Sequence, residues 1–405
     1  MAGAEWQIAV RDEFTEISGM KWRQRAGWAI CVVLAMLVVG CAFEPARVAA
    51  KPREIPVFPP PPERARFIYE RTLYSSADVV DDAADGEFER LVTGTVRAGE
   101  GLQKPYGLAV YKGKVYVGDT VRRRVAVFDI PGKSYSTIGD EDPGSLRLPL
   151  GLDVDGKGTL YVADGTTMRI QMYGPDGTFL RQFGGPDTFY RPAGIGVNSE
   201  GTRLYVVDIG GVDNDSHRVR VFDPRTGTHL FDFGSRGDGP GDFNLPRDVV
   251  VAPNGLIYVV DGGNFRVQVF DGDGRFLRVF GSVGRQGGQF SRPKEIATDL
   301  AGNVYVVDSA FGNFQIFDAD GQLLLDVGGR SDSDAPAKYM LPSGIAVDGD
   351  GRVYMVDQFF RKVDVFRPAE LAPTGGYVAK AGRGAAPAAG SKTGPAARTS
   401  GTTAP

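Results

Sequence analysis

Six copies of one pattern occupy the middle of this 405-residue chain and constrain its fold more than any other feature. Each copy runs from a proline and a short apolar segment through a glycine turn to an aliphatic-Tyr-aliphatic-x-Asp segment. Two landmarks keep nearly the same rhythm, with the aspartates spaced by 45, 44, 53, 47 and 49 residues. A shared rhythm predicts a repeated structural unit. The landmarks are Asp119, Asp164, Asp208, Asp261, Asp308 and Asp357, with Pro105, Pro149, Pro192, Pro246, Pro293 and Pro342.

The fourth copy, which begins at Pro246, shows the unit most clearly. It contains four short strand-like segments, DVVVA, LIYVVD, RVQVFD and FLRVF, separated by the glycine turns PNG, GGN and GDG. The second segment is apolar on both faces, which is typical of a strand covered on both sides. Four antiparallel strands packed between two similar units describe a propeller blade. The sequence therefore predicts an all-β, six-bladed β-propeller over residues 64–370.

The last copy lacks a fourth strand, because residues 371–405 are almost all Ala, Gly, Pro, Ser and Thr. A strand-like segment without a blade of its own, Arg66 to Tyr74, precedes the first copy. We expect it to complete the last blade, which ties the two ends together and removes an exposed sheet edge. The alternative is an open array with naked terminal blades. We expect the tail itself to be disordered, because its composition cannot form a core.

The N-terminal region has the pattern of an export signal. Three basic residues between Lys21 and Arg25 precede an apolar run of 14 residues over 26–39. Spanning a membrane takes about 20 residues, so we interpret residues 1–40 as a signal peptide, with Met20 as a possible true start. The alternative is an uncleaved anchor with an incidental cysteine. Residues 41–63 are rich in proline and are expected to form a semi-rigid spacer.

The run ends in Val38-Val39-Gly40-Cys41, which resembles the lipobox of bacterial lipoproteins. The resemblance implies cleavage before Cys41 and lipidation of its sulfur. Ala42 follows in place of Asp, which by the same resemblance implies transfer to the outer membrane, facing the periplasm, if the cell has two membranes. We therefore expect an exported protein that is anchored to the membrane through Cys41.

The repeats resemble NHL repeats, whose pattern is Pro-x-Gly-Ile-Ala-Val-Asp, then Val-Tyr-Val-x-Asp, then Asn-Arg-Ile-Gln-Val-Phe. SGIAVDG at Ser343, VYVVD at Val304 and RVQVF at Arg266 carry the resemblance, which covers about residues 64–368. Blades of WD-repeat, kelch and quinoprotein propellers use tryptophan, which is absent from this chain after Trp28. NHL propellers include interaction modules and enzymes, so the function depends on the site.

Two recurring features are candidates for chemistry. The first pairs the landmark aspartate with an arginine at the start of the next strand, as in Asp119 with Arg124, and predicts a structural ion pair across one hairpin. The same pair is expected at Asp164 with Arg169, Asp208 with Arg218 and Asp261 with Arg266.

The second feature lies at the head of the inner strand, where four copies have glycine. Copies four and five have Arg247-Asp248 and Lys294-Glu295 there instead. We expect these four charges to cluster beside the central channel on one face. Their interpretation stays open between an inter-blade salt-bridge cluster and a ligand-binding patch.

Metal binding has weak candidates only. Asp213 and Asp215 in the insertion of copy three supply too few oxygens for calcium, so no cofactor is expected, with Ca²⁺ as a weak possibility. The strand pairing predicted around Pro224 separates His217 from His229 by roughly 17 Å at 3.4 Å per residue, which excludes a shared zinc ion. A calcium site of the gluconolactonase type, built from Asp153, Asp248 or Glu295, stays open.

The function prediction follows from these features. A net charge of −4 without a basic stripe gives no reason to expect nucleic acid. We expect a non-catalytic binding scaffold of the cell envelope, whose partner is an envelope protein or peptide. Its recognition face is expected to be the loops after the Tyr-Val-x-Asp strands and the loops before each proline. The alternative is a calcium-dependent hydrolase or lactonase with its carboxylates in the channel.

Overall fold

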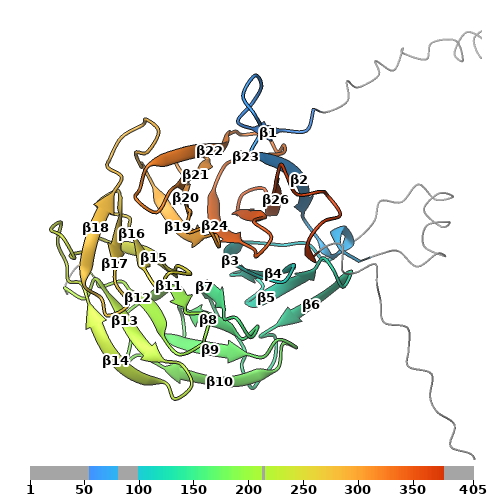
Figure 1. Cartoon of the computed structure of the whole chain (residues 1–405). Helices are drawn as coiled ribbons and strands as arrows, with labels where there is room; N and C mark the ends of the chain where they lie inside the picture. Colours follow the sequence, from blue (N-terminus) through green and yellow to red (C-terminus); the bar gives the residue numbers. More distant parts are fainter. Residues whose placement is uncertain (1–53, 81–98, 212–214, 378–405) are drawn as a thin grey trace, which may run out of the picture. The chain divides into compact units, whose positions relative to one another are not determined.

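The computed structural model describes residues 54–80, 99–211 and 215–377, and these form a ring of six β-sheets around a common centre (Figure 1). Each sheet starts with an inner strand that begins at one of the landmark prolines. In blades one to four, three further strands follow in sequence order from the centre to the rim, each antiparallel to the last. The prediction of an all-β, six-bladed propeller is confirmed.

The first three blades have four strands each. Blade one comprises β3 (Pro105–Tyr111), β4 (Lys114–Asp119), β5 (Arg124–Asp129) and β6 (Ser134–Ile138). Blade two comprises β7 (Pro149–Val154), β8 (Leu160–Asp164), β9 (Arg169–Tyr173) and β10 (Phe179–Gly184). Blade three comprises β11 (Pro192–Val197), β12 (Leu204–Asp208), β13 (Arg218–Asp223) and β14 (Thr228–Phe233).

Blade four also has four strands, whereas blades five and six each have a fifth strand at the rim. Blade four comprises β15 (Pro246–Val251), β16 (Ile257–Asp261), β17 (Arg266–Phe270) and β18 (Phe276–Phe280). Blade five comprises β19 (Pro293–Thr298), β20 (Val304–Asp308), β21 (Asn313–Phe317), β22 (Leu323–Arg330) and β23 (Lys338–Tyr339). Blade six comprises β24 (Pro342–Val347), β25 (Val353–Asp357), β26 (Lys362–Pro368), β2 (Phe67–Leu73) and β1 (Val57–Phe58), and a short 3₁₀ turn, η2 (Ser76–Asp78), follows β2.

Blade six closes the ring with strands from both ends of the described chain. β2 pairs antiparallel with β26, from Phe67 opposite Pro368 to Leu73 opposite Val363. The fully buried Arg352 donates from Nε to Glu70 of β2 at 2.9 Å and from its other nitrogens to the carbonyls of Pro373 and Gly375. The predicted closure by the segment from Arg66 to Tyr74 is therefore confirmed.

Both segments that flank the propeller lie against it over the part that is described. Val57 and Phe58, in the proline-rich segment predicted as a spacer, pair with β2, and the Phe58 ring contacts the Phe366 ring at 5.9 Å. The backbone N–H of Tyr377 donates to Asp350, so contact with blade six continues beyond residue 370. Apolar burial explains the difference from the expected spacer, because Phe58 fills the rim beside β26.

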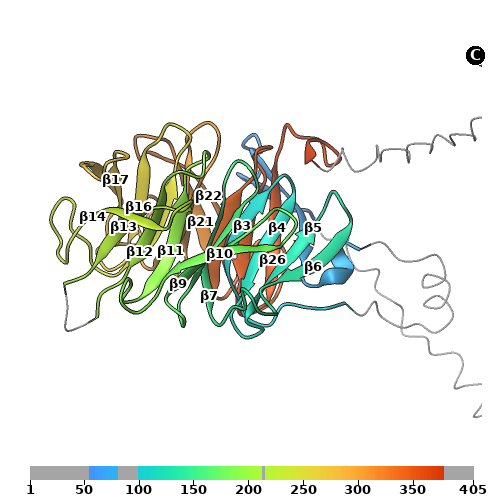
Figure 2. The ribbon, with the colours of Figure 1, turned by 90° about the horizontal axis from the view of Figure 1, so that it is seen from below.

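The hydrophobic core is divided into layers between blades. Six clusters of buried residues each join two neighbouring blades, as Leu108 of β3 and Val356 of β25 do in the layer between blades one and six. The second strands β8, β12, β16, β20 and β25 are buried at every residue, as their two apolar faces predict. Figure 2 shows the ring edge-on, with the strands crossing between its two faces.

Candidate functional site

The direction of the inner strands defines two faces of the ring. All six begin at the landmark prolines, so their heads meet at one face, which we call the loop face. It carries the loops that end at these prolines and the loops after the landmark aspartates. The opposite turn face carries the turns between inner and second strands, such as residues 112–113, 155–158 and 299–302.

The landmark aspartates organise the loop face. All six are fully buried and accept hydrogen bonds from backbone N–H groups just before the proline of the same blade. Asp164, for example, accepts from Arg147 and Leu148, and its second oxygen accepts from Thr166 and Thr167. A buried carboxylate is stable when several donors surround it. These aspartates therefore fix the loops at both ends of the hairpin.

The predicted Asp–Arg ion pair is correct in two blades and wrong as a general rule. Arg266 contacts Asp261 at 2.9 Å and Arg218 contacts Asp208 at 3.3 Å. Arg124 lies opposite Asp119 in the strand register but forms its ion pairs with Glu100 and Asp140. The backbone donors already satisfy the aspartate, so the arginine is free to pair elsewhere. The sequence spacing predicted the neighbours across the hairpin, but it gave no sign of the backbone donors that lie 15 to 18 residues upstream of each aspartate.

Glycine at the head of the inner strand is required by close approach between blades. A Cβ atom on Gly107 would lie 1.9 Å from the carbonyl oxygen of Leu150, and one on Gly151 would lie 2.3 Å from that of Ala193. Blades four and five have Asp248 and Glu295 at this position. Asp248 packs on the neighbouring Gly194 and is 8% exposed. The carboxyl group of Asp248 in blade four therefore occupies the space beside Gly194 of blade three, which has no side chain.

The two carboxyl groups bridge to the next blade through its backbone. Asp248 accepts a hydrogen bond from the N–H of Ile296 at 3.1 Å, and Glu295 accepts one from the N–H of Ile345. Burial raises the pKa of Asp248 from 3.8 to about 7, although these backbone donors lower it. Burial, together with the nearby Asp248 charge, raises the pKa of Glu295 well above its usual range. Both groups therefore hold protons more tightly than exposed carboxyls do.

A third carboxyl group belongs to Asp153, which lies in the inner strand of blade two, two residues after the glycine at the head of that strand. Its Oδ2 accepts from the N–H of Val197 at 2.7 Å, and its Oδ1 accepts from that of Val154 at 2.8 Å. Burial raises its pKa from 3.8 to about 7, against these two hydrogen bonds. In the sequence this residue stood out only as an acid at a position where other blades have Ala, Gly or Val.

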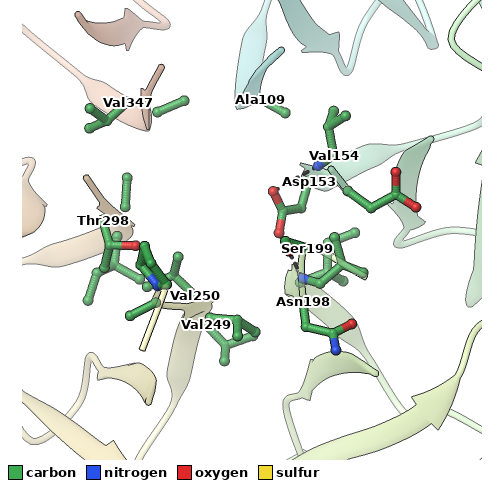
Figure 3. Close-up of a pocket in the computed structure, with 18 of the residues that line it drawn as sticks. Ala109, Asp153, Val154, Asn198, Ser199, Val249, Val250, Thr298 and Val347 are labelled. Carbon is green, nitrogen blue, oxygen red and sulfur yellow. Dashed lines mark hydrogen bonds between the residues drawn. The ribbon is translucent and has the colours of Figure 1, made fainter. Parts of the chain in front are cut away.

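The three carboxyl groups line a central cavity of about 820 Å³ that extends to the turn face. Figure 3 shows Asp153 pointing into this cavity, with Val250, Thr298 and Val347 on the facing wall. Asp248 and Glu295 are the lining residues nearest the loop face. The cavity is therefore a funnel with a mixed polar and aliphatic lining and with carboxyl groups at its inner end.

The basic residues that precede the two carboxyl groups, Arg247 and Lys294, lie outside the cavity lining. Arg247 lies against Gly262 in a loop of the loop face. The Lys294 ammonium lies 5.5 Å from the centre of the Tyr106 ring, which reaches it from blade one. Burial and the nearby charge of Glu295 raise the pKa of Tyr106 to about 12. Sequence reasoning missed Tyr106, because its partners come from blades far away in the chain.

The four predicted charges thus lie at the heads of two neighbouring inner strands, where the carboxyls line the cavity and the cations do not. Within the described residues, Arg247, Asp248, Lys294 and Glu295 form no ion pair. Of the two interpretations that the sequence leaves open, the inter-blade salt-bridge cluster therefore finds no ion pair among the described residues. Neighbouring residues of a strand point to opposite sides, which separates each cation from the acid that follows it.

The histidines and the metal candidates lie apart from this site. The buried His217 accepts at Nδ1 from the N–H of Gly210, whereas His229 lies opposite Phe222 and contacts Asp232 at 2.6 Å. Asp213 lies outside the described residues. Among those that are described, Asp215 included, no three acidic, histidine or cysteine side chains converge as a metal site would require.

The targeting segments cannot be followed in the structure. Residues 1–40, with Cys41 and the linker up to 53, lie outside the described residues, as does the tail from 378. Within the described part, no helix has both the length and the apolar character needed to cross a membrane. Export and lipidation therefore stay predictions.

The fold defines this protein as a six-bladed β-propeller, and comparison with known proteins refines the class. Residues 243–270 match the model of the NHL repeat. Over 97 residues the chain is 34% identical to "Probable peptidyl-alpha-hydroxyglycine alpha-amidating lyase pgal-1" of Caenorhabditis elegans, covering 23% of this chain and 26% of that one. Over 101 residues it is 36% identical to NHL repeat-containing protein 3 of Homo sapiens, covering 25% and 26%.

The chain thus spans about a quarter of the length of these relatives. A solved structure of unknown function from Bacteroides thetaiotaomicron has a TM-score of 0.52 at 18% identity, covering 67% of this chain and 70% of that one. This likeness shows a shared fold. The relatives include both a lyase and a protein named for its repeats alone, so the site has to decide between binding and catalysis.

Proposed function

We propose that this protein is an exported lipoprotein, anchored through Cys41, whose propeller is a non-catalytic scaffold that binds an envelope protein or peptide at the loop face. One observation carries the proposal: Arg247 and Lys294 rise at the centre of that face without an ion-pair partner among the described residues. A cation that packs beside the channel without an ion-pair partner keeps its charge available to a ligand, which supports a binding role.

Exposed apolar side chains on the same face support binding of a protein. Tyr190 before Pro192 is 50% exposed and Phe359 after Asp357 is 58% exposed. Aromatic and arginine side chains are enriched at protein interfaces because they combine area with directed contacts. The loops that present them are fixed by the landmark aspartates, so the face is preorganised.

A photo-crosslinking residue tests the proposed face directly. We would place it at Tyr190 or Phe359 on the loop face, and at Leu300, 73% exposed on the turn face, as the matched control. We expect a discrete crosslinked adduct in cells from the first two positions and none from Leu300. Adducts from Leu300 alone would contradict the proposal.

The membrane anchor is tested separately. We expect Cys41→Ser to abolish labelling by a fatty-acid analogue, because the lipobox-like motif offers this sulfur as the acceptor. The wild-type protein should fractionate with the membrane and the variant should not. Equal labelling of both proteins would overturn the anchoring proposal and leave the loop-face proposal intact.

The funnel supports a second candidate, a calcium-dependent hydrolase or lactonase. The specific observation is that Asp153, Asp248 and Glu295 line one cavity that is large enough for a small substrate, although within the described residues these carboxyls do not converge as a metal site would require. Calcium prefers ionised carboxylates, whereas burial raises the pKa of these groups, so the binding scaffold is better supported. Calorimetric titration with Ca²⁺ decides: binding that is lost in Asp153→Ala would favour the enzyme.

A further inference from the structure

Four cations gather where the channel reaches the loop face, and we call them the cationic mouth: Lys104, Arg247, Arg292 and Lys294. Lys104 precedes Pro105 of blade one, Arg247 follows Pro246 of blade four, and the other two flank Pro293 of blade five. Lys104, Arg247 and Arg292 are exposed, whereas Lys294 is half-buried. Burial lowers the pKa of Lys294, and the charges of the other three lower it further, although Glu295 opposes this. Lys104, Arg247 and Arg292 therefore lie close enough to Lys294 to repel its ammonium group.

Glu295 is the one nearby charge that favours the ammonium form of Lys294, and it forms no ion pair with any of the four cations among the described residues. None of the four forms an ion pair within the described residues. The nearest carboxyls, Asp248 and Glu295, have raised pKa values, so at neutral pH they carry less than their full negative charge. Like charges held together without counter-ions are relieved when an anion binds. The mouth is therefore suited to a negatively charged group from outside the fold.

The surroundings favour a short anionic segment over a long polyanion. The loops around the mouth carry exposed carboxylates at Glu141, Asp187, Asp238 and Asp332. A nucleic acid that crosses the face would meet these charges, in a chain whose net charge is −4. A peptide can place one or two carboxylates in the mouth and rest its apolar side chains on Tyr190 or Phe359, which are exposed on the same loops.

We propose that the cationic mouth binds the carboxylate groups of an acidic peptide segment, with Arg247 and Lys294 as the central contacts and Lys104 and Arg292 beside them. This inference rests on the proposed scaffold function and names the chemistry of its partner. Arginine forms the forked hydrogen bonds that suit a carboxylate, and lysine adds a point charge.

The test uses the full-length protein in detergent and fluorescent hexapeptides. The probe is an acidic peptide, Glu-Asp-Phe-Glu-Asp-Leu, and its matched control is the amide peptide Gln-Asn-Phe-Gln-Asn-Leu. We expect the acidic peptide to bind, the amide peptide to bind at least tenfold more weakly, and added salt to weaken the acidic complex. A uridine oligonucleotide serves as the competing polyanion and is expected to bind more weakly than the acidic peptide.

Paired variants place the binding on one face. We expect Arg247→Gln/Lys294→Gln to reduce affinity for the acidic peptide at least tenfold, with an unchanged melting temperature. The control Lys112→Gln/Lys157→Gln removes two exposed charges from the turn face and should leave the affinity unchanged. Equal affinity in both double variants, absence of acidic-peptide binding in low salt, or tighter binding of the oligonucleotide would each overturn the inference. Crosslinking from Tyr190 or Phe359 alongside such a failure would show that only this inference, and not the scaffold function, is wrong.

Discussion

Blades four and five solve the contact with their neighbour differently from the other four blades. In blade one, Gly107 lets two inner strands approach until a Cβ atom would lie 1.9 Å from the carbonyl oxygen of Leu150. In blade four, Asp248 stands at the same position and accepts a hydrogen bond from Ile296 of the next inner strand. One interface is closed by backbone contact and the other by a carboxyl bridge.

The difference shows which blades place functional side chains at the channel wall. Glycine at the head of an inner strand places no side-chain functional group at the channel wall. A carboxyl head buries an ionisable group beside the channel, and a basic residue precedes it in the sequence. The chemistry of the channel is therefore concentrated on one side of a nearly symmetric ring.

The largest effect is expected when the glycine interface is broken. Gly107→Ala forces its Cβ against the backbone of Leu150, which has no flexible end that can move aside. We expect a loss of about 3 kcal/mol or more in the free energy of unfolding, measured by chemical denaturation. Gly101→Ala is the control, because its nearest contact would be an ordinary 3.4 Å. Equal stability of the two variants would show that the blades tolerate separation.

The landmark aspartates should respond alike in both kinds of blade. Asp164 in blade two and Asp261 in blade four are both fully buried acceptors of hydrogen bonds from the loop before the proline. We expect Asp164→Ala and Asp261→Ala each to lower the free energy of unfolding by about 2–3 kcal/mol, because donors are left unpaired. The exposed Asp187→Ala is the control. A clear difference between the two buried sites would mean that the blades differ beyond the strand heads.

The carboxyl bridge should make stability depend on pH. The pKa of Asp248 is about 7 in the folded protein against an ordinary 3.8, so the folded state binds the proton more tightly. Its contribution to stability is then complete below pH 4 and is lost as the pH rises through 7. Asp248→Asn keeps an oxygen for the N–H of Ile296 and cannot ionise. We expect its stability relative to the wild type to rise by about 2 kcal/mol between pH 5 and pH 8. Parallel pH profiles from melts of the two proteins would contradict a buried titrating group.

The smallest effect is expected at the arginine beside this bridge. Arg247 is exposed and has no ion-pair partner in the described part of the chain, so Arg247→Gln should change the free energy of unfolding by less than about 0.5 kcal/mol. Arg352→Gln, which removes a buried contact with Glu70, is the contrasting variant and should melt clearly earlier. A large loss at Arg247 would make it a structural residue and weaken its proposed binding role.

Much of the fold was predictable because it is encoded locally. Each repeat carries its own turns and its own doubly apolar second strand, so the number of blades follows from counting. Closure of the ring was also predictable. The last repeat lacks its outer strand, and the strand before the first repeat belongs to no blade of its own, so pairing the two satisfies both. The site was only half predictable: Asp248 and Glu295 stood out against glycine, whereas Tyr106 and the turn-face funnel did not.

The sequence by itself thus determined the blade count, the closing strand and the two blades that depart from the common pattern, because these depend on residues close together in the chain. Only the tertiary structure decided that the landmark aspartates bind loop backbones, and that the carboxyls line the cavity whereas the neighbouring cations do not. These features depend on groups that meet across the ring axis, such as Lys294 and Tyr106 from blades five and one. Local sequence spacing cannot predict such a contact, because the two residues are brought together by the angle between successive blades around the ring.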